Sequence, residues 1–153
     1  FSANAAVSMF EIGGFLGSLF GGWGSDRFFR GNRAPMILIF ALGIFASVSA
    51  LWLTPLDNFM VLSGCFFCIG FFVFGPQMMI GMAAAECSHK DLAGTATGFV
   101  GLFGYLGAAL ASYPLALIIE RFSWQGFFSV ITLSAACIGL LILPFVKAQD
   151  VRA

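Results

Sequence analysis

Long apolar runs divided by short polar stretches dominate the sequence. A helix that crosses a bilayer needs about 20 mostly apolar residues. Five runs meet this requirement and predict transmembrane helices at about 3–23, 35–53, 59–85, 92–119 and 126–146. The polar stretches that separate or follow these runs lie at 24–34, 54–58, 86–91, 120–125 and in a tail at 147–153. The pattern therefore predicts an all-α membrane protein with five transmembrane helices.

The composition favours the same fold and excludes a soluble domain. The chain is 60% hydrophobic and 9% charged, and its mean hydropathy is +1.00. These values leave too few polar residues to cover a water-facing surface. The formal net charge is zero, so the chain offers no basic field for nucleic acid. The chain begins at Phe1 and runs almost at once into apolar sequence, which favours a truncated product of a longer protein.

The distribution of basic residues indicates an orientation in the membrane. Alternate loops lie on opposite sides, and six of the seven lysines and arginines then share one side. These six residues are Arg27, Arg30, Arg33, Lys90, Lys147 and Arg152. The other side has only Arg121, next to Glu120. By the positive-inside rule, the first side and the C-terminus are expected to be cytoplasmic.

The most specific local signal is the stretch 22–33, which reads GWGSDRFFRGNR. It resembles the G-x-x-x-D-R-x-x-R motif that the major facilitator superfamily carries in a cytoplasmic loop. Asp26 can pair with an arginine near a helix end, and Gly22 can let an adjoining helix approach. We expect a gating latch formed by five residues, Gly22, Asp26, Arg27, Arg30 and Arg33. The alternative is that the arginines only obey the positive-inside rule.

Two ordered rows of glycines predict close helix contacts. Small residues on one face of a membrane helix let a neighbouring backbone approach closely. The first row, spaced by four residues, is Gly13, Gly17 and Gly21. The second row, spaced by three residues, is Gly98, Gly101, Gly104 and Gly107. The alternative is the general enrichment of glycine in membrane helices.

Three polar residues within the apolar runs are candidates for lining a solute pathway. Glu11 lies roughly 12–14 Å into the first run at 1.5 Å per residue, where a carboxylate facing lipid is costly. It is expected to face the bundle interior or a wet cavity, or to form a structural hydrogen bond between helices. Gln77 and Tyr105 are weaker candidates, and ordinary helix-to-helix contacts are the alternative for both.

The sequence favours neither an enzyme nor a bound cofactor or metal. Cys65 and Cys68 form a C-x-x-C pattern inside an apolar run, with no second pair and no nearby histidine to complete a metal site. The chain also has no nucleophile–base pair and no phosphate-binding loop followed by Lys-Ser/Thr.

Longer stretches resemble one family within the superfamily, the organophosphate:phosphate antiporters. They are MFEIGGF (9–15), GNRAPM (31–36), IGFFVFGPQM (69–78) and GFVGLFGYLG (98–107). The resemblance covers essentially the whole chain. It implies helices eight to twelve of a twelve-helix fold in a bacterial inner membrane.

Two further stretches, 81–90 and 143–149, most resemble family members that sense hexose phosphate. This implies a membrane sensor that binds external glucose 6-phosphate and signals to a membrane histidine kinase. The alternative is an antiporter that exchanges hexose phosphate for inorganic phosphate by alternating access. The family binds phosphate largely through arginines in its first and seventh helices, which this chain lacks. The implied partners are therefore the lipid bilayer, the missing N-terminal helices and, in the full-length protein, sugar phosphate and inorganic phosphate.

Overall fold

The computed structural model describes residues 2–53 and 59–150, with side chains described for 4–53 and 59–144. The elements in chain order are α1 (Ser2–Phe29), α2 (Arg33–Leu53), α3 (Phe59–Cys87), a short 3-10 turn η1 (Lys90–Leu92) and α4 (Ala93–Asp150). Every element in these ranges is helical, which confirms the predicted all-α class. The expected turn at 54–58 lies outside the described residues.

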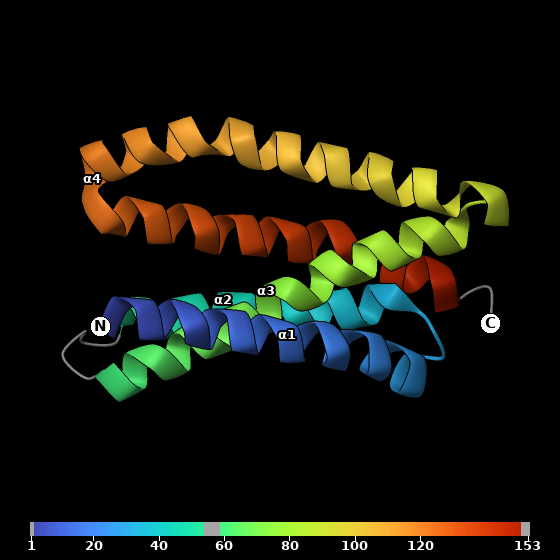
Figure 1. Cartoon of the computed structure of the whole chain (residues 1–153), viewed down its shortest axis with the longest axis horizontal. Coiled ribbons are helices and arrows are strands. Elements are labelled where there is room, and N and C mark those ends of the chain that lie inside the picture. The colour runs from blue at the N-terminus through green and yellow to red at the C-terminus, as the bar shows by residue number, and fades with distance from the viewer. Residues whose placement is uncertain (1, 54–58, 151–153) are drawn as a thin grey trace.

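The number of helices differs from the prediction, because the expected fourth and fifth helices form one element. Within the described residues, four helices are long and apolar enough to cross a membrane. In α4, Ser123 leaves the helical path at φ 57° and ψ −163°. Figure 1 shows the chain reversing near the middle of α4, so that its two arms run side by side. The break between the two arms therefore falls inside the expected loop at 120–125, but it needs only one non-helical residue instead of six.

The helices also extend further than the apolar runs predict. α1 continues to Phe29 instead of ending near Trp23, so that Asp26 and Arg27 belong to the helix and not to a loop. It ends only where Arg30 and Gly31 adopt positive φ angles of 54° and 85°. α4 likewise continues through Asp150, which includes part of the expected tail at 147–153. A helix satisfies its own backbone hydrogen bonds, so a polar sequence does not by itself end it.

Contacts of α3 hold the first three helices together. α3 packs extensively against α1 and also contacts α2, while α2 in turn contacts α4. Figure 1 shows α1, α2 and α3 grouped together, with the first arm of α4 (93–122) standing apart from α1 and α2. The core lies between α2 and α3, where Phe40 and Met79 are almost fully buried. The ring of Phe40 stacks on Phe71 at 5.6 Å and fits beside Gly75, where a Cβ would collide with it.

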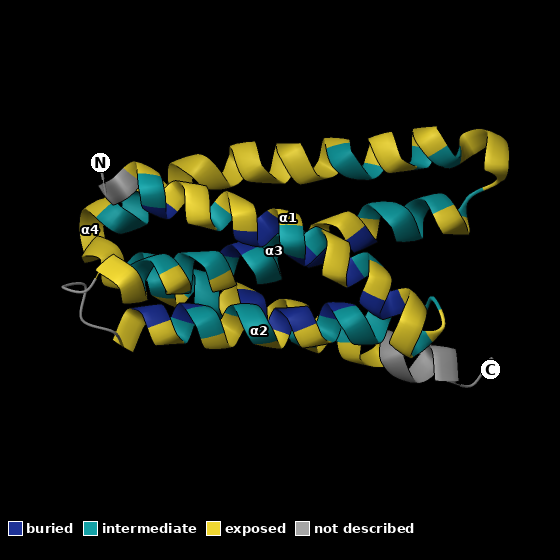
Figure 2. Ribbon diagram, turned by 60° about the horizontal axis from the view of Figure 1, so that its bottom comes forward, coloured by how far each residue is buried: buried dark blue, intermediate teal, exposed yellow. Residues whose placement is uncertain are grey.

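Many large apolar side chains lie exposed on the outer surface of the helices. Figure 2 shows exposed residues along most of the first arm of α4, whereas buried positions concentrate where α1, α2 and α3 meet. An apolar outer surface is unfavourable in water but suits the hydrocarbon core of a bilayer. The arrangement is that of a polytopic membrane protein.

The two glycine rows differ in what they contact. A Cβ at Gly13 or Gly17 would collide with the backbone carbonyl oxygens of Phe67 and Phe71 on α3, so this row does allow close helix contact. The row on α4, by contrast, has no atom of another described segment within 4 Å of a Cβ built at any member, which are Gly98, Gly101, Gly104 and Gly107. No described segment makes the predicted contact with this second row, which stays a prediction for the complete protein.

The reversal in α4 predicts a stabilising substitution, Ser123→Gly. Near φ 57° and ψ −163° a side chain is strained, and the region is occupied essentially by glycine. We expect the replacement to raise the free energy of unfolding by about 1 kcal/mol. Ser129→Gly is the matched control, because Ser129 lies in regular helix, where glycine should lower stability by about 1 kcal/mol. Unfolding titrations in mixed detergent micelles compare the two variants, and a loss of stability in both would contradict the strained geometry.

Candidate functional site

The ends of three helices meet at a cluster of charged residues. Two backbone hydrogen bonds hold the turn from α1 to α2, from the Gly31 amide to the Ser25 carbonyl at 3.1 Å and from the Asn32 amide to the Phe29 carbonyl at 2.9 Å. The Ser25 hydroxyl also donates to the Asn32 carbonyl at 3.1 Å. The Asn32 side-chain oxygen accepts a hydrogen bond from the Ala34 amide at 3.1 Å, which caps the start of α2. This local structure places Arg33, the first residue of α2, beside the ends of α1 and α3.

Arg33 joins the three helix ends through two carboxylates. Its Nη1 lies 2.9 Å from Oδ1 of Asp26 on α1. Its Nη2 and Nε donate to Oε1 and Oε2 of Glu86 on α3, at 2.6 and 3.4 Å. Arg33 is 8% exposed, whereas the side chains of Asp26 and Glu86 are 62% and 50% exposed. A buried guanidinium with two-atom contact to one carboxylate is a strong and directional link.

The other residues of the predicted latch do not join this cluster. Arg27 and Arg30 are exposed and form no ion pair with any residue that the structure describes. A Cβ built at Gly22 has nothing within 4 Å, so no described helix packs against it, and the expected close approach stays a prediction for the complete protein. Among the five latch residues, the structure brings together only Asp26 and Arg33.

A second feature is a groove between α3 and the first arm of α4. It measures about 470 Å³ and is lined by Gln77, Ile80, Gly81, Thr97, Val100, Gly101, Gly104, Tyr105 and Ala108. The amide of Gln77 and the hydroxyl of Tyr105 can both donate and accept hydrogen bonds there. The structure therefore brings together two of the three candidate pathway residues.

The third candidate, Glu11, lies apart from the groove. It is exposed on α1 and makes no hydrogen bond or ion pair with a residue in the described part of the chain. The described helices therefore neither bury the Glu11 side chain inside the bundle, as expected, nor form the alternative hydrogen bond with it. Asn4 and Ser8 precede Glu11 by seven and three residues and Ser18 follows it by seven, so all four lie on the same side of α1.

Comparison with known proteins decides the family. The Major Facilitator Superfamily model matches residues 1–112 of this chain. The chain belongs to the Major Facilitator Superfamily. This confirms the superfamily resemblance that residues 22–33 carry in the sequence.

Several bacterial proteins align with nearly the whole chain. The membrane sensor protein UhpC of Escherichia coli is 62% identical over 151 residues, covering 99% of this chain and 34% of the sensor. A probable hexose phosphate transport protein of Chlamydia trachomatis is 50% identical, covering 97% and 33%. The hexose-6-phosphate:phosphate antiporter of Salmonella typhimurium is 34% identical, covering 92% and 31%. The chain spans about a third of the length of these relatives.

One member of the charge cluster in this superfamily chain was missed by sequence reasoning. The sequence predicts only a polar loop at 86–91 that contains Glu86, whereas the structure places Glu86 in the last turn of α3. The signal available in the sequence was topological, because the end of the third apolar run and the start of the second lie on the same side of the membrane. Glu86 is separated from Arg33 by 53 positions, so no local motif contains both.

Proposed function

We propose that this chain is part of a bacterial inner-membrane sensor of external hexose 6-phosphate, corresponding to helices eight to twelve of a twelve-helix protein. The observation that carries the proposal is a contrast in similarity. The chain is 62% identical to sensor proteins of Escherichia coli and Salmonella typhimurium but 34% identical to a hexose-6-phosphate:phosphate antiporter. The second candidate is the antiporter function, favoured by the 50% identity to a probable hexose phosphate transport protein.

The charge cluster is proposed to lie on the cytoplasmic side, with the C-terminus on that side as well. The positive-inside rule supports this orientation, since Arg27, Arg30 and Arg33 share one end of the bundle. Asp26, Arg33 and Glu86 would act there as a latch that holds three helix ends in one arrangement. A membrane histidine kinase would detect a change in that arrangement. External ligand can shift the balance only if it binds the two arrangements with different affinities.

The groove between α3 and α4 is proposed as part of the ligand pathway. Gln77 and Tyr105 would offer hydrogen bonds to sugar hydroxyls, while arginines elsewhere in the complete protein would hold the phosphate. Glu11 would face helices of the complete protein that are absent from this chain. An intramembrane carboxylate supports this placement, because it is costly when it faces lipid.

Two measurements on the complete protein distinguish sensor from antiporter. Deletion of the gene should abolish induction of hexose phosphate uptake by external glucose 6-phosphate, while uptake through a separately expressed transporter continues. Purified protein in vesicles should not exchange labelled glucose 6-phosphate for internal phosphate. Exchange in vesicles, with induction intact after deletion, would instead establish the antiporter.

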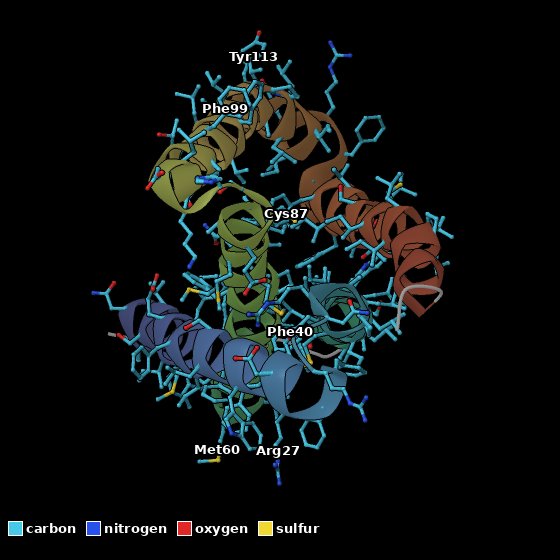
Figure 3. The ribbon with its side chains drawn as sticks, turned by 90° about the vertical axis from the view of Figure 1, so that its right-hand side faces the viewer. Arg27, Phe40, Met60, Cys87, Phe99 and Tyr113 are labelled. Atoms are coloured by element: carbon cyan, nitrogen blue, oxygen red, sulfur yellow. The ribbon has the colours of Figure 1, made fainter. Side chains whose placement is uncertain are left out.

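Substitutions in the groove provide a prediction about specificity. Gln77→Leu or Tyr105→Phe in the complete protein should each raise the glucose 6-phosphate concentration for half-maximal response by about threefold to tenfold, since each removes one hydrogen bond. Tyr113→Phe is the matched control on the same arm of α4. Figure 3 shows Tyr113 pointing away from the other helices, and it does not line the groove. A dose–response assay of induction that gives the same shift in all three variants would contradict this assignment.

A further inference from the structure

Two arginines, one in the last turn of α1 and one just after it, have no ion-pair partner among the described residues. Arg27 and Arg30 are exposed and form no ion pair, although Asp26 is adjacent in the sequence. The Asp26 carboxylate contacts Arg33 instead, and Arg33 also engages Glu86. Figure 3 shows the side chain of Arg27 pointing away from the bundle. These guanidinium groups are therefore available to an anion that comes from outside the described chain.

An apolar groove lies on α1, one helical turn before Arg27. It measures about 270 Å³ and is lined by Leu19, Phe20 and Trp23. Leu19, Trp23 and Arg27 follow one another at spacings of four residues, so they lie along one side of α1. Their side chains remain exposed, with Trp23 at 57%. Toward the end of α1, this side therefore presents first the apolar Leu19, then the aromatic ring of Trp23 and then the positive charge of Arg27.

We propose that this side of α1 binds one anionic phospholipid. Arg27 and Arg30 hold the headgroup phosphate, and an acyl chain lies along the groove of Leu19, Phe20 and Trp23. The rise of about 1.5 Å per residue places Arg27 roughly 6 Å beyond Trp23, which suits a ring at the interface and a cation among the headgroups. A free anion would use the arginines and leave the apolar groove uncovered, whereas a phospholipid occupies both.

The test is lipid binding to the complete protein in detergent, measured by native mass spectrometry with phosphatidylglycerol and phosphatidylcholine of identical acyl chains. Phosphatidylglycerol should bind more tightly. Arg27→Gln together with Arg30→Gln should weaken its binding by about 25-fold, at about fivefold for each cation. Arg121→Gln is the matched control, since Arg121 is exposed near Trp124 at the reversal in the middle of α4. It should leave phosphatidylglycerol binding within about twofold.

Further variants separate the headgroup from the acyl chain and a lipid from free phosphate. Trp23→Ala should weaken binding of long-chain phosphatidylglycerol more than binding of its short-chain analogue, because the long chain covers more of the groove. Arg27→Lys with Arg30→Lys should retain most of the preference for the anionic lipid, and millimolar inorganic phosphate should not displace that lipid. Equal binding of the two lipids, equal losses in the Arg27/Arg30 and Arg121 variants, or displacement by inorganic phosphate would overturn the proposal.

Discussion

Arg33→Gln is expected to lower the free energy of unfolding by about 2 kcal/mol. Arg33 is 8% exposed and contacts both Asp26 and Glu86. Its loss removes the only ion pairs that connect the ends of α1, α2 and α3 in the described part of the chain. Breaking a buried ion pair from one side costs about 3–5 kcal/mol. The two carboxylates here are half exposed or more, and water therefore compensates part of that loss.

The measurement is reversible unfolding in mixed detergent micelles, followed by circular dichroism. Arg27→Gln is the matched control, because it removes the same charge from an arginine that has no described ion-pair partner. Arg27 lies only six positions before Arg33. It should change the free energy of unfolding by no more than about 0.5 kcal/mol. Arg33→Lys should fall between the two, since an ammonium keeps the charge but loses the two-atom contact with Glu86. Equal losses for Arg33→Gln and Arg27→Gln would show that the cluster carries no specific stability.

Hydrophobic length predicted the existence of the membrane helices but not where they end. The bilayer imposes a minimum apolar length and requires internal backbone hydrogen bonds, so each apolar run must be helical. Neither requirement stops a helix at the interface. α1 therefore continues through Asp26 and Arg27 to Phe29, and α4 needs only Ser123 to reverse direction.

The candidate site was predictable only as far as local spacing extends. The motif at 22–33 contains both Asp26 and Arg33, but it cannot indicate which arginine pairs with the aspartate. Glu86 arrives through the packing of α3 against α1 and α2, which depends on shape and not on sequence proximity. Gln77 and Tyr105 share a groove because α3 and α4 are neighbours, whereas Glu11 does not line it. The neighbouring helices decide which surface of a membrane helix is covered. The sequence pattern of a single helix does not indicate which helices those neighbours are.

The glycine rows make this distinction measurable, and Gly17→Ala is expected to be the more damaging of two otherwise identical changes. A Cβ at Gly17 would collide with the backbone carbonyl oxygen of Phe71, which cannot move without shifting α3. Overpacking of this kind costs about 1–3 kcal/mol, so we expect a loss of that size in the free energy of unfolding.

Gly104→Ala is the matched change on α4, where no atom of another described segment lies within 4 Å of the new Cβ. Alanine favours helix over glycine by about 0.5–1 kcal/mol, so this variant should be at least as stable as the parent chain in the same micelle titration. Similar effects at Gly17 and Gly104 would mean that both rows reflect only the general abundance of glycine. Opposite signs would show that glycine spacing marks a packing face only where a partner helix is present, as α3 is for α1.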